Sequence, residues 1–113
     1  MTTDLNDWPG VYAYAAGLAG AAESSYYGAP AIMAAASNRP VVTAGREDDS
    51  FVLHIDLDHK AMLMDLHSDR FWETPHYSGY PALLVRYGPA EPVAEWINRA
   101  LELAAAKPLR KRK

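Results

Sequence analysis

The strongest constraint on the fold lies near the C-terminus, where an apolar stripe follows a helical spacing. Its members recur at i, i+4, i+7, i+8 and i+11, and they are Val93, Ile97, Ala100, Leu101 and Ala104. This spacing places all five side chains on one face of a helix. Pro92 precedes the stripe in a first-turn position, and Pro108 ends it. Because a helix of this kind gains most of its stability from packing, we expect its apolar face to lie on another element of the chain.

The middle of the chain is predicted to form short strands on which this helix can pack. Phe51, Leu53 and Ile55 alternate with less apolar neighbours, which is the period-2 pattern of a strand with one buried face. The β-branched run 41–44 is also typical of a strand, and the polar segment 45–50 between them predicts a hairpin connection. Two further strands are predicted at 31–34 and 80–87. We expect these strands to form an antiparallel sheet.

Two more helices are predicted from their first turns. Asp7 is a suitable N-cap before Pro9, and this helix should end between Gly17 and Gly20. Asp56 and Asp58 place negative charge at the start of a second helix that ends near 67–68. Residues 24–30 are expected to form an aromatic loop that contains a turn.

The predicted order is therefore a helix, about three strands, a second helix, one or two strands and a final helix. Antiparallel strands with helices grouped on one face make a two-layer α+β domain. A chain of 113 residues is sufficient for one domain, which we place at residues 1–106, with a basic tail at 107–113.

Composition narrows the class of partner. Five of the 11 basic residues lie in the last seven positions, so residues 1–106 hold six basic side chains against all 14 acidic ones. A nucleic-acid surface needs a basic stripe on the folded body, which argues against a dedicated DNA-binding protein. No run of about 18 apolar residues predicts a membrane span. The absence of cysteine suits a reducing cytoplasm, where we expect the protein.

The most distinctive local feature is the run FWETPHYSGYP at 71–81. It holds five rings, counting an imidazole: Phe71, Trp72, His76, Tyr77 and Tyr80. Two prolines and a glycine restrict the backbone, so these rings have few ways to point. The rings either pack the loop onto the core or form one wall of a binding site.

Several segments together resemble the MmcQ/YjbR family. They are YGAPA at 27–31, RPVV at 39–42 and FWETPHYSGYPALLVR at 71–86, and the Ala-Lys-Pro exit of the last helix is also similar. The likeness extends over roughly residues 8–110, and the Thr-Pro-His-Tyr-x-Gly-Tyr-Pro run is its most specific part. It implies a compact α-β-β-β-α-β-β-α domain related in shape to type III secretion chaperones and frataxin-like proteins. It also implies the DNA-binding function commonly attributed to that family, and no catalytic residue.

The residues offer no evident catalytic or metal centre. The serines lack a nucleophile-elbow context, and the glycines form no phosphate-binding loop. His59 and His67 are eight residues apart, about 12 Å along a helix, which is too far for one metal. An enzyme would depend on His76 and Arg86 alone. His76 is either a proton carrier or a loop histidine bonded to the backbone, and Arg86 either binds an anion or pairs with a carboxylate.

Two binding functions therefore remain in front of an enzymatic one. The first is a non-enzymatic module that binds a small molecule or protein without a cofactor, with candidate residues Tyr27, Trp72, His76, Tyr77, Tyr80 and Arg86, and Tyr26 beside them. The second is weak, non-specific DNA binding through Arg39, Arg46, Lys107, Arg110, Lys111, Arg112 and Lys113. We expect a monomer or weak dimer.

Overall fold

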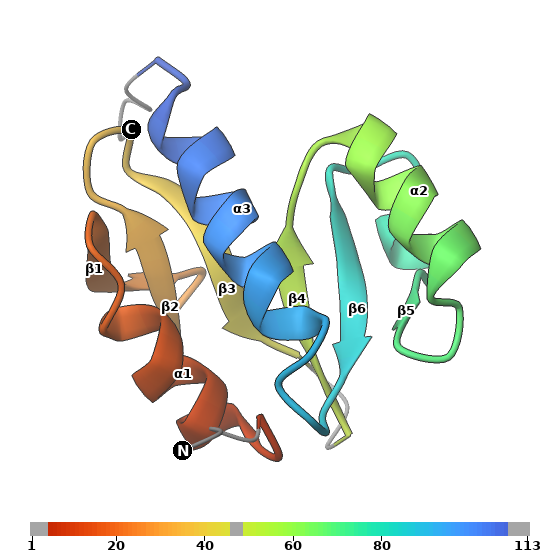
Figure 1. Cartoon of the computed structure of the whole chain (residues 1–113). Coiled ribbons are helices and arrows are strands. Elements are labelled where there is room, and N and C mark those ends of the chain that lie inside the picture. The colour runs from red at the N-terminus through yellow and green to blue at the C-terminus, as the bar shows by residue number, and fades with distance from the viewer. Residues whose placement is uncertain (1–4, 46–48, 109–113) are drawn as a thin grey trace.

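The computed structural model describes residues 5–45 and 49–108 and builds one sheet with helices packed against it (Figure 1). Its elements are α1 (Trp8–Ala16), β1 (Ala21–Tyr26), β2 (Ala29–Ala34), β3 (Arg39–Ala44), β4 (Ser50–His54), α2 (Leu57–Leu66), β5 (Phe71–Trp72), the short 3₁₀ helix η1 (Pro75–Tyr77), β6 (Ala82–Arg86) and α3 (Val93–Ala105). The six strands are arranged in the order β1-β2-β3-β4-β6-β5, and every neighbouring pair is antiparallel. The predicted α+β class is confirmed.

The order of elements differs from the sequence-based expectation by one strand. Four strands precede α2, because residues 21–26 form β1 where we expected a helix end followed by a loop. The segment AAESSY is small and polar, and its middle residues are exposed, so it carries no strand pattern. It forms a strand through its pairing with β2, where Ala21 lies opposite Ala34 and Tyr26 opposite Ala29.

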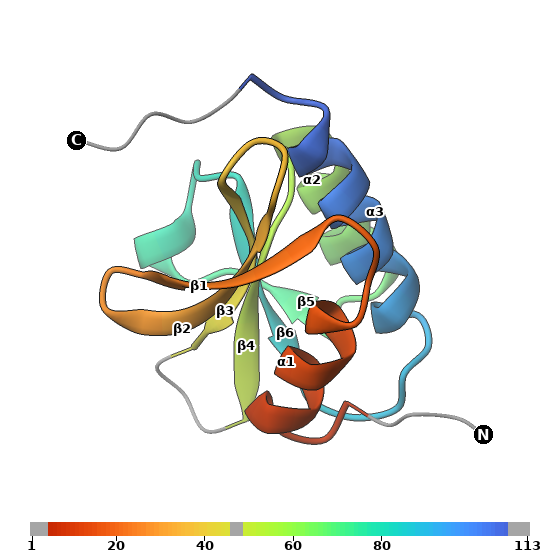
Figure 2. The same cartoon turned by 90° about the vertical axis from the view of Figure 1, so that its left-hand side faces the viewer.

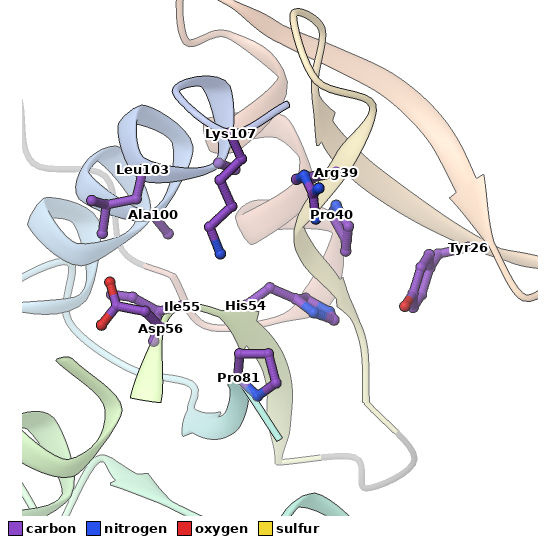
Figure 3. A pocket seen from close by; sticks show the side chains of 11 residues that line it. Tyr26, Arg39, Pro40, His54, Ile55, Asp56, Pro81, Ala100, Leu103 and Lys107 are labelled. Carbon is purple, nitrogen blue, oxygen red and sulfur yellow. The ribbon is translucent and has the colours of Figure 1, made fainter. Parts of the chain in front are cut away.

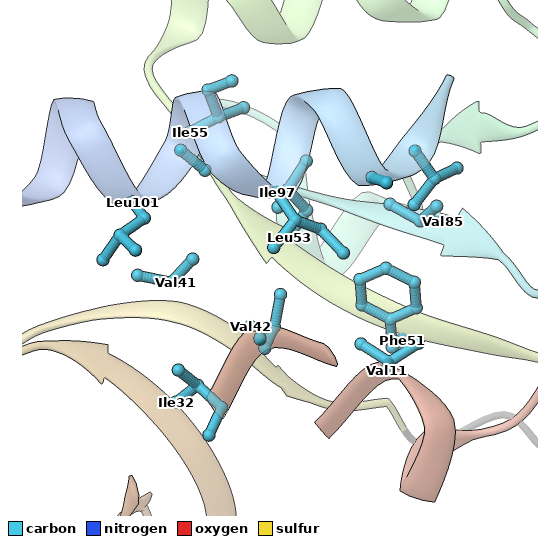
Figure 4. Close-up of a cluster of buried hydrophobic side chains, with 14 of the residues drawn as sticks. Val11, Ile32, Val41, Val42, Phe51, Leu53, Ile55, Val85, Ile97 and Leu101 are labelled. Atoms are coloured by element: carbon cyan, nitrogen blue, oxygen red, sulfur yellow. The ribbon is translucent and has the colours of Figure 1, made fainter. Parts of the chain in front are cut away.

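All three helices lie on the same face of the sheet, as Figures 1 and 2 show. The five stripe residues of α3 are buried, which confirms the helical stripe as the packing face. They join Val41, Phe51 and Leu53 from the strands in one apolar cluster (Figure 4).

No helix among the described residues is both long and apolar enough to cross a membrane.

The predicted N-cap Asp7 and the helix-start carboxylate Asp56 set where α1 and α2 begin. The carboxylate of Asp7 accepts a hydrogen bond from the backbone N–H of Gly10 at 2.8 Å. Asp56 does the same for His59, also at 2.8 Å. Each cap satisfies a backbone donor that the first turn of a helix leaves without a partner.

The opposite face of the sheet carries a second, smaller apolar cluster. Val52, Leu84 and Ala82 are buried there, with Trp72 and Tyr77 packed against them. Two of the aromatic residues from the 71–81 run therefore cover this face instead of standing free. The pairing of β5 with β6 places Trp72 beside Leu84, and η1 carries Tyr77.

Candidate functional site

The candidate site is a pocket of about 220 Å³ at one end of the sheet, below the C-terminal end of α3 (Figure 3). It lies where β3 begins and β4 ends, so it draws on elements that are far apart in the sequence. Its lining consists of Tyr26, Arg39, Pro40, His54, Ile55, Asp56, Pro81, Ala100, Leu103, Ala104 and Lys107. Apolar and proline side chains make most of the wall, and charged groups stand at several points around it.

Two cationic side chains line the pocket. Lys107, just past the end of α3, reaches towards His54, and Arg39 stands at the start of β3 (Figure 3). The Nε–H of Arg39 donates to the backbone carbonyl of Pro108 at 3.0 Å, which ties the guanidinium to the segment that carries Lys107. Arg39 and Lys107 therefore bring two positive charges to the pocket on an otherwise acidic body.

Two rings form the wall opposite α3. The ring of His54 meets that of Tyr26 edge to face, with centroids 5.5 Å apart. His54 Nε2 is 3.1 Å from the hydroxyl of Thr43, which is buried in the sheet. These two contacts hold the His54 ring in one orientation at the wall of the pocket.

Asp56 supplies the negative charge of the pocket, and its carboxylate is hydrogen-bonded to His59. Both of its carboxylate oxygens lie within 2.9 Å of His59 Nδ1, and one of them also caps α2. Desolvation raises the pKa of Asp56, but the hydrogen bonds from His59 and the charge of Lys107 outweigh it, so the pKa is lowered overall. No group of His, Asp or Glu side chains within the described ranges is arranged to hold a metal ion.

The lowered pKa of Asp56 predicts a stability difference that depends on pH. Asp56→Asn keeps a good N-cap but removes the charge, so the difference in unfolding free energy between the two proteins reports the charge together with its pairing to His59. A lowered folded pKa means that this contribution is complete above the ordinary value of about 3.9 and is lost as the pH falls through the folded value. We expect less than about 1 kcal/mol at neutral pH, because the side chain is 34% exposed.

Urea unfolding at several pH values between about 7 and about 2 measures this difference. Asp65→Asn, at the other end of the same helix, is the matched control for the loss of a carboxylate from α2. A difference for Asp56→Asn that persists unchanged at the lowest pH would contradict the assignment.

The six residues predicted as an aromatic ligand site do not line this pocket. Tyr27 and Tyr80 are 89% and 62% exposed, and His76 is exposed with its ring against that of Tyr77. Trp72 and Tyr77 pack on the second apolar cluster. However, direct neighbours of two of them do line it, since Tyr26 precedes Tyr27 and Pro81 follows Tyr80. The two aromatic loops therefore reach the pocket through residues adjacent to the predicted ones.

Arg86 points away from the core, as alternation with buried Val85 predicts. Its guanidinium lies 4.8 Å from the ring centre of Trp72 and donates to the carboxylate of Asp49 at 3.1 Å. Of the two interpretations of Arg86, the structure shows the pairing with a carboxylate.

Of the residues predicted for nucleic acid, Arg39 and Lys107 are brought together at the pocket. Arg46, Arg110, Lys111, Arg112 and Lys113 lie outside the described residues.

A buried lysine that the sequence analysis did not single out holds the aromatic loop. Lys60 of α2 is 2% exposed, and its ammonium donates to the carbonyls of Tyr77 and Tyr80 at 2.7 and 2.9 Å. Its third partner is the carboxylate of Glu73 at 2.7 Å. The three donors of the ammonium are thus all used. The burial of Lys60 could have been inferred from the sequence, because Lys60 lies three residues before the apolar Leu63 and so shares its face of the helix.

Comparison of the chain with protein-family models, with curated proteins and with solved structures finds no match in any of the three.

Proposed function

We propose that this domain is a non-enzymatic binding module that takes a small organic anion carrying a flat ring. The observation that carries the proposal is the pairing of Arg39 and Lys107 over a concavity lined mainly by apolar groups. An anionic group would meet the two cations, and a ring would lie between the Tyr26–His54 wall and Leu103 of α3. Apolar walls with a few placed polar groups are the usual composition of small-molecule sites.

The size of the pocket limits the ligand. A volume of about 220 Å³ is below the range of about 300–1,000 Å³ typical of drug-sized ligands. A single-ring metabolite with one anionic group is the class that suits this volume. Because Pro40, Pro81 and the His54 contacts restrain the walls, little ordering is needed on binding, which favours affinity.

DNA binding is the alternative that the resemblance to the MmcQ/YjbR family supports. It would use the same two cations together with the basic residues beyond Pro108. The strongly acidic remainder of the chain opposes it, because affinity for DNA comes largely from neutralising phosphates. The two functions make different demands on the tail, so they can be separated by experiment.

Titration with benzoate, with neutral benzamide as the matched probe, tests the proposal. Benzoate should perturb the NMR signals of Arg39, His54 and Lys107, and benzamide should bind far more weakly because it lacks the charge. Arg39→Met should reduce benzoate affinity about 10-fold, the loss expected for a hydrogen bond to a charged group. Arg99→Met, on the exposed side of α3, removes the same charge elsewhere and should leave affinity unchanged.

A variant ending at Leu109 distinguishes the two functions. It keeps Lys107 and leaves the carbonyl that accepts from Arg39 as part of a peptide bond, so benzoate binding should persist. Duplex DNA should bind the full chain no more tightly than ~10⁻⁴–10⁻⁶ M near physiological salt, and this variant should not bind it. Equal binding of benzoate and benzamide, or tight DNA binding by the shortened chain, would overturn the proposal.

A further inference from the structure

The first strand lies at an open edge of the sheet. β1 has β2 on one side and no described strand on the other. Figure 2 looks at the sheet from this side and shows β1 in front of the remaining strands. Exposed edges are usually protected by lysine, proline, a bulge or short length. β1 has six residues, no lysine or proline, and an uninterrupted register with β2.

The pairing with β2 determines which backbone groups point outwards. The N–H of Ala35 donates to the carbonyl of Gly20 at 2.9 Å, one rung beyond the Ala21–Ala34 pair. Pro30, which has no N–H, lies opposite Ser25. Alternate residues of an antiparallel strand face opposite sides, so the N–H and C=O groups of Glu23 and Ser25 point along the open edge.

Side chains on this edge allow another strand to approach closely. Glu23 is drawn towards α1, where the hydroxyl of Tyr12 donates to its carboxylate at 2.9 Å. Ser24 and Ser25 are small and exposed. The charge on the edge is therefore held aside, and the outward-pointing backbone groups are accessible.

Tyr27 at the end of β1 has an unusual conformation. It forms the two-residue hairpin turn with Gly28, and both have positive φ, at 52° and 81°. Asparagine or glycine is the usual residue at such a position, and a bulky side chain there is strained. This side chain is also 89% exposed, the highest value among the large apolar side chains described. The ring meets that of Tyr26 edge to face, with centroids 4.6 Å apart, and is otherwise exposed. An exposed aromatic ring in a strained turn indicates a role outside the stability of the monomer.

We propose that β1 pairs antiparallel with β1 of a second copy of this chain, joining two sheets across a two-fold axis at Ser24. In this register Glu23 exchanges both backbone hydrogen bonds with Ser25 of the partner. Tyr27 comes opposite Ala21 and Tyr26 opposite Ala22, which covers the exposed ring with small apolar residues. A register centred on Glu23 would oppose two carboxylates, and one centred on Ser25 would shorten the overlap. The second copy is favoured over an unrelated strand because the edge is self-complementary in this one register.

Sedimentation velocity from ~10 µM to ~1 mM, the affinity range of weak complexes, tests the proposal. The chain should convert from monomer to dimer over this range. Ser25→Pro removes an outward N–H that β2 does not use, so it should remain monomeric throughout. Ser25→Ala keeps the N–H and should dimerise as the unaltered chain does.

Charge variants and a turn variant keep the test independent of folding defects. Ser24→Lys and Ser24→Glu place like charges opposite each other, and each should weaken the dimer about 5-fold. An equimolar mixture of the two should recover dimerisation. Tyr27→Asn should raise the melting temperature by relieving strain while weakening the dimer. A monomer at all concentrations, or a dimer insensitive to Ser25→Pro and to Ser24 charge, would overturn the proposal.

Discussion

Replacing Glu73 with alanine should lower the free energy of unfolding by about 3 kcal/mol, a large effect for a residue that is not in the core. The substitution leaves the ammonium of Lys60 buried without a counter-charge, and breaking a buried ion pair in this way costs about 3–5 kcal/mol. We expect the lower end, because the carboxylate is 31% exposed and water can partly replace it. Urea denaturation followed by tryptophan fluorescence measures the change.

A double-mutant cycle tests whether the stability lost in Glu73→Ala comes from the unpaired ammonium of Lys60. Lys60→Met removes the charge but preserves much of the side-chain volume, so Lys60→Met/Glu73→Ala should be no less stable than Glu73→Ala alone. Glu102→Ala, which breaks the exposed pair with Arg99, is the control and should change stability by at most about 1 kcal/mol. Strictly additive losses in the cycle would show that Lys60 and Glu73 stabilise the fold independently.

The elements that sequence reasoning located are those whose pattern reports burial on one face. The stripe from Val93 to Ala104 and the alternation at Phe51, Leu53 and Ile55 predicted the main cluster, because each pattern follows from a single packed side. The caps at Asp7 and Asp56 were equally predictable, since they satisfy local backbone donors.

β1 could not be found in this way. An edge strand with exposed serines has no buried face, so its sequence shows no alternating apolar pattern. It becomes a strand only through its pairing with β2 in the tertiary structure.

The pocket was not predictable because it is assembled from the ends of elements. Arg39 and Lys107 are far apart in the chain, and only the packing of α3 on β3 places them around one cavity. The aromatic runs lie next to the pocket through Tyr26 and Pro81, but the residues predicted from them do not line it. Sequence spacing does not show that β5 and η1 place Trp72 and Tyr77 on the second face and that Pro81 lies at the pocket.

Phe51→Ala should lower the free energy of unfolding by about 3–5 kcal/mol, because it deletes a fully buried ring and leaves a cavity. Phe51 lies at the centre of the sheet, paired with Val85, and its ring is 5.8 Å from that of Tyr87. Neighbouring strands are fixed by their hydrogen bonds and cannot collapse into the space. Phe51→Leu retains much of the volume and should cost less than about 1.5 kcal/mol. Leu66→Ala, at a 63% exposed position, should have a much smaller effect in the same urea titration. Equal losses for Phe51→Ala and Leu66→Ala would contradict the central packing of this ring.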